Sequence, residues 1–169
     1  MNNNWFTVRV KYTRQMESGA FKRVTEPYLL AAVSFTDAET RIYEELGSLI
    51  RGEFTVLSIA RTEIHDIFQY DESDVWYKAV ISYDKMDEEG DKKSKIKQTF
   101  LVGAESVKEA NDRIVENLST LMIDYTIDGI VFTPLVDIFP FLSEEEKMDR
   151  ELAAKLRADV AAENEEDEA

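Results

Sequence analysis

Two tryptophans accompanied by cations are the residues of this sequence with the clearest potential for chemistry. Trp5 precedes an alternating segment, Phe6 to Tyr12, and the period-2 alternation places it opposite the apolar side chains, beside Arg9 and Lys11. Aromatic rings interleaved with cations are typical of surfaces that bind single-stranded nucleic acid, where each stacked base contributes about 1–3 kcal/mol. The residues predicted to bind nucleic acid are Trp5, Arg9, Lys11, Arg14, Lys22, Arg23, Trp76, Lys78, Lys93 and Lys95.

Burial of both tryptophans is the competing interpretation. Tryptophan is on average a mostly buried residue, so each ring would then pack beneath a helix, the tail or the other half of the chain. The two interpretations differ in one observable, which is the exposure of the indole rings.

Little else in the sequence is suited to catalysis or metal binding. Cysteine is absent and His65 is the single histidine, which excludes zinc sites and Cys–His pairs. We expect His65 to be a half-buried strand residue. Asp66 and Asp137 could meet as a carboxylate pair, but bonding to nearby backbone amides is the favoured interpretation. The acidic turn 84–91 does not match a calcium loop, because Lys95 stands where a bidentate glutamate is required. We expect no enzyme and no cofactor.

The chain contains an internal duplication at an offset of 71 to 72 residues. Trp5 aligns with Trp76, and the ending Asp66-Ile67-Phe68 aligns with Asp137-Ile138-Phe139. Hairpin glycines also align, Gly19 with Gly90. Each copy shows the pattern strand, strand, helix, strand.

The elements of each copy follow from hydrophobic periodicity. The predicted strands are 6–12, 24–33 and 54–68 in the first copy and 77–83, 96–102 and 125–139 in the second. Pro27 indicates a sheet edge or a bulge, and Pro134 a bend in the last strand. The predicted helices have capping boxes at Thr36 and Ser106. Their predicted apolar faces are Ile42, Leu46, Leu49 and Ile50, and Ile114, Leu118, Leu121 and Met122.

One such unit has a single helix to cover its sheet, so two copies are expected to bury their remaining apolar surface on each other. The predicted fold class is α+β, one domain of two β-β-α-β repeats related by a pseudo-twofold axis. The repeats span residues 1–70 and 71–141, and an acidic tail spans 142–169. A capping box at Ser143 begins a helix in the tail, and residues 163–169 are predicted to be disordered.

Charge is unevenly distributed along the chain. The net charge is −15, and residues 141–169 hold 11 acidic against 4 basic side chains. The net negative charge of the protein repels nucleic acid. Because much of that charge lies in the tail, the rest of the chain can still present a local basic face. Without cysteines, a secretory signal or an apolar run of about 20 residues, the chain is expected to be soluble and cytoplasmic.

Several segments resemble one family. They are 5–12, 22–30, 52–56, 76–78 and 124–127. The family comprises uncharacterised proteins of Bacteroidetes and their phages and mobile elements, described only as a domain of unknown function. The resemblance covers nearly all of residues 5–140 and implies a small cytoplasmic protein associated with replication genes, without any established site residues.

The expected function is a non-catalytic accessory protein that binds single-stranded DNA in phage or mobile-element replication, with an acidic tail that recruits partner proteins. The alternative is a protein–protein adaptor, or an inhibitor that mimics nucleic-acid charge. An enzyme that uses His65 or the pair Asp66 and Asp137 is the third hypothesis.

Overall fold

A computed structural model describes residues 4–86, 88–90 and 93–167 of the chain. The chain divides into a body, Met1–Phe139, and a tail, Pro140–Ala169. The body contains strands β1 (Trp5–Gln15), β2 (Phe21–Ala31), β3 (Phe54–Thr62), β4 (Asp66–Phe68), β5 (Trp76–Met86), β6 (Lys93–Gly103), β7 (Tyr125–Thr133) and β8 (Ile138–Phe139), and helices α1 (Phe35–Gly47) and α2 (Val107–Leu118). The predicted α+β class is confirmed.

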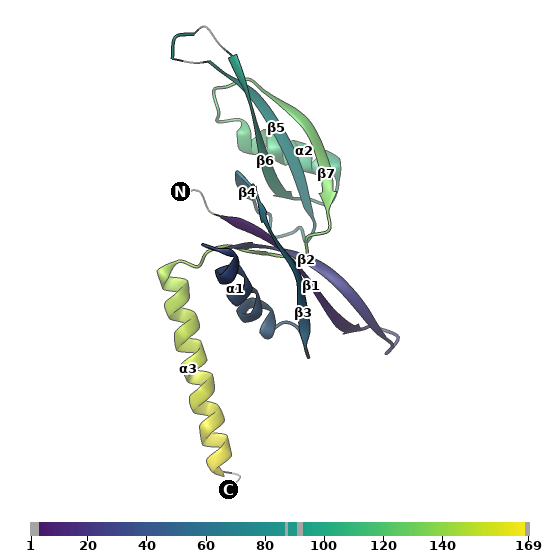
Figure 1. The fold of residues 1–169 in the computed structure, drawn as a ribbon, viewed down its shortest axis with the longest axis vertical. Coiled ribbons are helices and arrows are strands. Elements are labelled where there is room, and N and C mark those ends of the chain that lie inside the picture. Colours follow the sequence, from purple (N-terminus) through teal and green to yellow (C-terminus); the bar gives the residue numbers. More distant parts are fainter. Residues whose placement is uncertain (1–3, 87, 91–92, 168–169) are drawn as a thin grey trace. The chain divides into compact units, whose positions relative to one another are not determined.

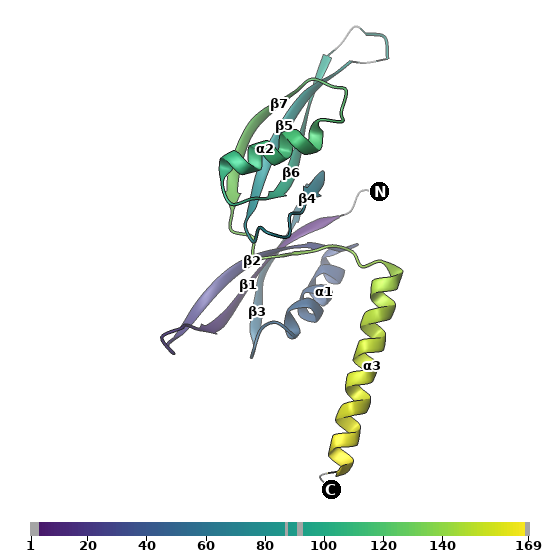
Figure 2. The ribbon, with the colours of Figure 1, turned by 180° about the vertical axis from the view of Figure 1, so that it is seen from behind.

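The body is built from two four-stranded sheets of matching topology, each with one helix against one face (Figures 1 and 2). The strand orders are β3-β1-β2-β8 and β7-β5-β6-β4. In each sheet three strands are antiparallel neighbours from one copy, and the fourth strand comes from the other copy. β8 pairs in parallel with β2, and β4 pairs in parallel with β6. The two copies therefore exchange their last strands.

The exchange explains the long closing segments. Residues 54–68 and 125–139 were predicted as single strands that bend, and each is in fact two strands that belong to different sheets. Pro134 follows directly after β7, at the predicted place, because it has no amide hydrogen to continue the ladder. The bend was predicted from the sequence, but the change of sheet was not.

Both hairpins turn at the predicted glycines. Gly19 and Gly90 have φ angles of 85° and 74°, a conformation that residues with a Cβ rarely adopt. The second strands are longer than predicted, since β2 begins at Phe21 and β6 at Lys93. The hairpins therefore extend well past the part of each sheet that its helix covers. Asp87 and Asp91, predicted in the acidic turn, lie outside the described residues.

Pro27 occupies the edge side of β2. Its carbonyl oxygen accepts a hydrogen bond from the Val136 amide at 3.0 Å, two residues before β8 begins. Because the N–H and C=O groups of one strand residue point the same way, the nitrogen of Pro27 also faces outward from the sheet. The missing donor of proline therefore costs no bond in the β1–β2 ladder.

Serines begin both helices at equivalent positions. Ser106 accepts a hydrogen bond from the Glu109 amide at 3.1 Å, as predicted, and Ser34 accepts one from the Asp37 amide at 3.1 Å. The predicted cap at Thr36 is wrong, because the box begins two residues earlier with aspartate as its acidic member. The helices also end earlier than predicted, so Leu49, Leu121 and Met122 are exposed.

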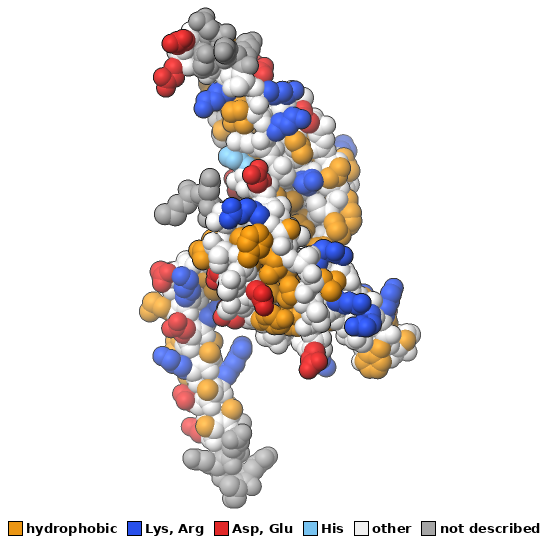
Figure 3. Space-filling view, viewed as in Figure 1, with side chains coloured by type: hydrophobic (Ala, Val, Ile, Leu, Met, Phe, Trp, Pro, Cys, Tyr) orange, Lys and Arg blue, Asp and Glu red, His pale blue; other side chains and the backbone are white. Residues whose placement is uncertain are grey.

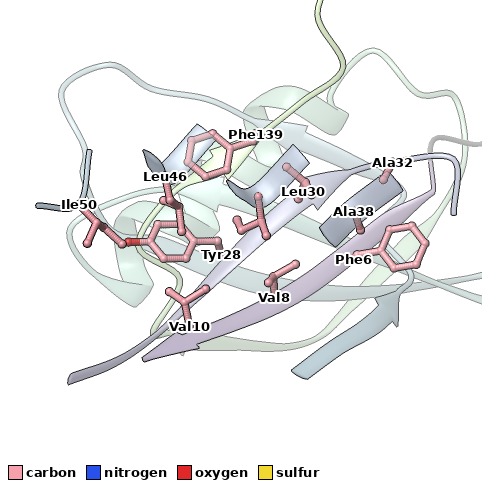
Figure 4. Packing of buried hydrophobic residues seen from close by; sticks show 11 residues of the cluster. Phe6, Val8, Val10, Tyr28, Leu30, Ala32, Ala38, Leu46, Ile50 and Phe139 are labelled. Carbon is pink, nitrogen blue, oxygen red and sulfur yellow. The ribbon is translucent and has the colours of Figure 1, made fainter. Parts of the chain in front are cut away.

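Each half has its own core between sheet and helix. Figure 4 shows the first, where Phe6, Val8 and Val10 of β1 meet the helix residues Ala38 and Leu46. An arginine at the equivalent position of each helix bonds the end of the second strand, Arg41 to the Ala31 carbonyl and Arg113 to the Gly103 carbonyl at 2.6 Å. These bonds tie each helix to its sheet.

The tail contains one helix, α3 (Glu144–Asp167). Its predicted cap is confirmed, since Ser143 and Glu146 exchange side-chain to backbone hydrogen bonds of 3.2 and 2.7 Å. The prediction of disorder from residue 163 is wrong for residues up to Asp167, because alanine and glutamate have a high intrinsic helix propensity. Residues 168 and 169 lie outside the described residues.

The strand exchange predicts that neither repeat folds alone. A fragment of residues 1–70 lacks β8 and carries a strand of the other sheet, and a fragment of residues 71–141 lacks β4. We expect each fragment to show no cooperative thermal transition by circular dichroism, and an equimolar mixture to regain one. The matched control is the intact chain 1–141. Cooperative unfolding of either fragment alone at the midpoint of that control would contradict the exchange.

Candidate nucleic-acid interface

Both tryptophans are buried, with only 7% of each residue exposed. The sequence placed them correctly on the face opposite the helix, because they alternate with the core residues Phe6 and Tyr77. This face is covered at that point by the other copy, so the prediction of an exposed stacking platform at Trp5 and Trp76 is wrong. The competing interpretation, burial against the other half, is confirmed.

The tryptophans form a third core between the two copies. Its buried members are Trp5, Leu29, Ala31, Trp76 and Leu101, and Ile64, Ile67, Leu135 and Ile138 pack around them. Ile64 and Leu135 come from the two crossing segments, and Ile67 and Ile138 come from the strands β4 and β8 to which these segments lead. Large aromatic side chains bury about 150–250 Å² each, so this cluster supplies a large part of the contact between the copies.

The predicted cations fall into separate groups. We define the outer face of each sheet as the face opposite its helix. Strand alternation and the β1–β2 register place Arg9, Lys11 and Arg23 on the first outer face. Lys78 and Lys95 lie on the second. Arg14 and Lys22 pair with each other in the register but point to the helix side of the first hairpin, so the prediction that they extend the same surface as Arg9 and Lys11 is wrong. The side chain of Lys93 lies outside the described residues.

The β1–β2 hairpin is strongly cationic. Residues 9–25 contain five lysines and arginines and one carboxylate, Glu17, within a chain of net charge −15. The outer-face positions of the paired strands, from Trp5 to Gln15 and from Phe21 to Ala31, include no acidic residue. Figure 3 shows Lys and Arg side chains beside hydrophobic atoms at the end of this hairpin.

One exposed residue of this hairpin was not predicted from the sequence. Phe21 is the first residue of β2, pairs in register with Gln15 and is 72% exposed. It shares the outer face with Arg23, two residues further along the strand. Because the second strand was predicted to begin at Val24, Phe21 lay outside the predicted strand and its face could not be assigned.

The second hairpin differs in charge. Asp84 lies directly opposite Lys95 in the β5–β6 register, and Glu88 and Glu89 are exposed at the tip. Opposite charges in a cross-strand pair offset each other. Duplication has therefore preserved the hairpin in both copies, while the cationic surface is concentrated in the first.

A cluster of polar side chains around one carboxylate, Glu26, lies on the helix side of the first hairpin. The hydroxyls of Tyr12 and Tyr28 donate to Glu26 at 2.8 and 2.9 Å, and Arg14 donates to it at 3.3 Å. Burial, followed by the hydrogen bond to Glu26, raises the pKa of both tyrosines. The second copy has Gln98 and Tyr83 at the matching positions, joined at 3.3 Å. Every polar group of the first cluster is paired, which is the arrangement of a structural site.

The other candidate residues are not assembled into a site. His65 is exposed and lies between β3 and β4, so the prediction of a half-buried strand residue is wrong. Its backbone amide donates to the Thr99 carbonyl at 2.8 Å, and its ring meets that of Phe100 edge to face. Asp66 and Asp137 each accept a hydrogen bond of 2.8 Å from the amide of the next residue, as the favoured interpretation predicted.

Within residues 4–86, 88–90 and 93–167 no three His, Asp or Glu side chains gather in a way that would hold a metal ion. A shallow hollow of about 360 Å³ lies between α1 and β3, lined by Phe35, Thr36, Glu39, Val56, Leu57, Ser58 and Ile59. It includes none of the predicted binding residues.

Comparison with known proteins assigns the chain to a family. A family model described as a domain of unknown function, DUF4494, matches residues 4–141, so the chain belongs to that family. The match covers both repeats and stops before α3. No curated protein and no solved structure matches the chain. Among its described helices, none has the length and apolar character required to cross a membrane.

The raised pKa of Tyr28 predicts a loss of stability at alkaline pH. A phenol whose folded pKa exceeds its unfolded value of about 10 contributes stability that is complete below that pH and is lost as the pH rises above it. We expect the free energy of unfolding in urea to fall as the pH rises above about 10, and to fall less in Tyr28→Phe.

The matched control is Tyr43→Phe, which removes a half-exposed hydroxyl outside the cluster. An equal pH dependence in Tyr28→Phe and in the unmodified chain would contradict the prediction.

Proposed function

We propose that this protein is a non-catalytic accessory protein that binds single-stranded DNA through the β1–β2 hairpin. The observation that carries the proposal is the charge of that hairpin, five cations against one carboxylate in residues 9–25 of an acidic chain. Binding to nucleic acid depends on cations near the phosphates, since each neutralised phosphate releases counterions. At physiological salt, charges further away than about 8 Å are largely screened, so the local charge outweighs the net charge.

The form of the surface supports a single strand as the ligand. Arg9, Lys11 and Arg23 project from a sheet face on which the side chains of alternate residues stand about 6.6 Å apart along a strand. An open cationic face with an exposed aromatic residue suits a flexible strand with accessible bases. We further propose a role in phage or mobile-element replication, with DNA as the strand that is bound.

A second candidate function, a protein–protein adaptor, is supported by α3. Met148, Leu152 and Leu156 are each more than half exposed, and acidic residues occupy the first turn of the helix. A helix with exposed apolar side chains at a spacing of four residues is suited to an apolar groove on a partner protein, and its charge favours a basic rim around that groove. The two functions are compatible, because they use different parts of the chain.

A charge-reversal titration tests the DNA proposal. We expect the double variant Arg9→Glu/Arg23→Glu to bind a labelled oligothymidine at least about tenfold more weakly at low salt. The slope of log affinity against log salt concentration should also become less steep by about 1.4, because two phosphate contacts are lost and each contributes about 0.7 to the slope. Fluorescence anisotropy at several salt concentrations measures both quantities.

The matched control is Lys155→Glu/Arg157→Glu on α3, which changes the net charge equally and should not reproduce the loss of slope. A chain truncated after residue 141 should bind at least as tightly as the full chain. If neither the full chain nor the truncated chain binds at low salt, the proposal is wrong.

A further inference from the structure

Phe21 is set apart from the other exposed aromatic residues of the body. Phe35, Tyr43 and Phe132 are each about half exposed or more, but each ring packs on another, with centroid distances of 5.0, 5.0 and 6.0 Å. In the part of the chain that the structure describes, no ring packs on Phe21.

Exposure alone does not make Phe21 a binding residue, since single apolar side chains on a surface are common. Its position is more informative. The β1–β2 register is continuous from Trp5 to Gln15, so Phe21 lies on the same outer face as Arg23, Lys11 and Arg9. It stands at the end of the sheet far from the tryptophan core, where the other copy does not cover this face.

The second copy lacks this feature. The residue that matches Phe21 in the β5–β6 register is Lys93, which pairs with Met86 as Phe21 pairs with Gln15. The aromatic residue and the carboxylate-free cationic face therefore occur together, in the first hairpin only.

We propose that Phe21 stacks on a base of the bound strand while Arg23 and Lys11 contact the neighbouring phosphates. This inference rests on the proposed function, and it moves the aromatic contact from the buried tryptophans to the tip of the first hairpin. Stacking on a flat ring is tolerant of sequence, because every base has a π face. The interface thus recognises the bases of single-stranded DNA without selecting among them.

The test compares four full-length proteins: the unmodified chain, Phe21→Ala, Phe21→Trp and Phe132→Ala. Phe132 is the matched control, because it is 61% exposed but packs on Tyr77, a core residue of the helix side of the second sheet. Each protein is titrated with a labelled oligothymidine and with an abasic oligomer of equal length. Thermal unfolding of each variant checks the fold.

We expect Phe21→Ala to bind oligothymidine about 5- to 150-fold more weakly than the unmodified chain does. Its affinity for the abasic oligomer should equal that of the unmodified chain. Phe21→Trp should keep the affinity of the unmodified chain. The fluorescence of its exposed indole should be quenched when oligothymidine binds. Phe132→Ala should bind normally.

The contrary outcomes are distinguishable. If the unmodified chain binds oligothymidine and Phe21→Ala binds it equally well, the role of Phe21 is wrong while the DNA proposal stands. Equal losses of affinity for both oligomers would likewise refute stacking by this residue. If the unmodified chain binds neither oligomer, the proposed function fails, and the role of Phe21 fails with it.

Discussion

The reciprocal exchange of β4 and β8 is the constraint on which the rest of the structure depends, because each sheet is completed by the other copy. The crossing segments bring Ile64 and Leu135 to the same place as Trp5 and Trp76, so the covalent path and the tryptophan core reinforce each other. Truncating a buried tryptophan to alanine typically costs about 3–5 kcal/mol, a large fraction of the stability of a domain of this size. The two copies are therefore halves of one folded unit.

This construction also determines which surfaces remain open. The part of each outer face nearest the tryptophans is buried against the other copy. The hairpin ends lie far from that core and stay accessible. Duplication gives two such hairpins, and only their sequences distinguish them. In the first, cations are accompanied by Phe21 and few carboxylates, whereas in the second Asp84, Glu88 and Glu89 offset the lysines. This difference between the two hairpins supports one binding face, in the first copy, on a scaffold whose two halves share the same topology.

The sequence predicted the repeat, the two helices and the faces of β1 and β5 from Trp5 to Tyr12 and from Trp76 to Tyr83, because these depend on local periodicity. The exchange of strands could not be predicted, since a bent strand and two strands in different sheets give the same pattern along residues 54–68. The same limit explains the tryptophans: alternation places Trp5 opposite Phe6, but only the packing of the copies decides whether that face meets water. Phe21 was missed because strand ends are set by pairing with a partner strand, and Gln15 gives no local signal of that pairing.

A titration of the isotopically labelled full chain with oligothymidine, followed by two-dimensional NMR, tests the central claim that the tryptophans hold the copies together while the first hairpin binds. The backbone amide signals of Lys11, Phe21 and Arg23 are expected to shift, whereas the indole signals of Trp5 and Trp76 are expected to stay in place. Shifts of both indole signals without movement at the first hairpin would contradict it.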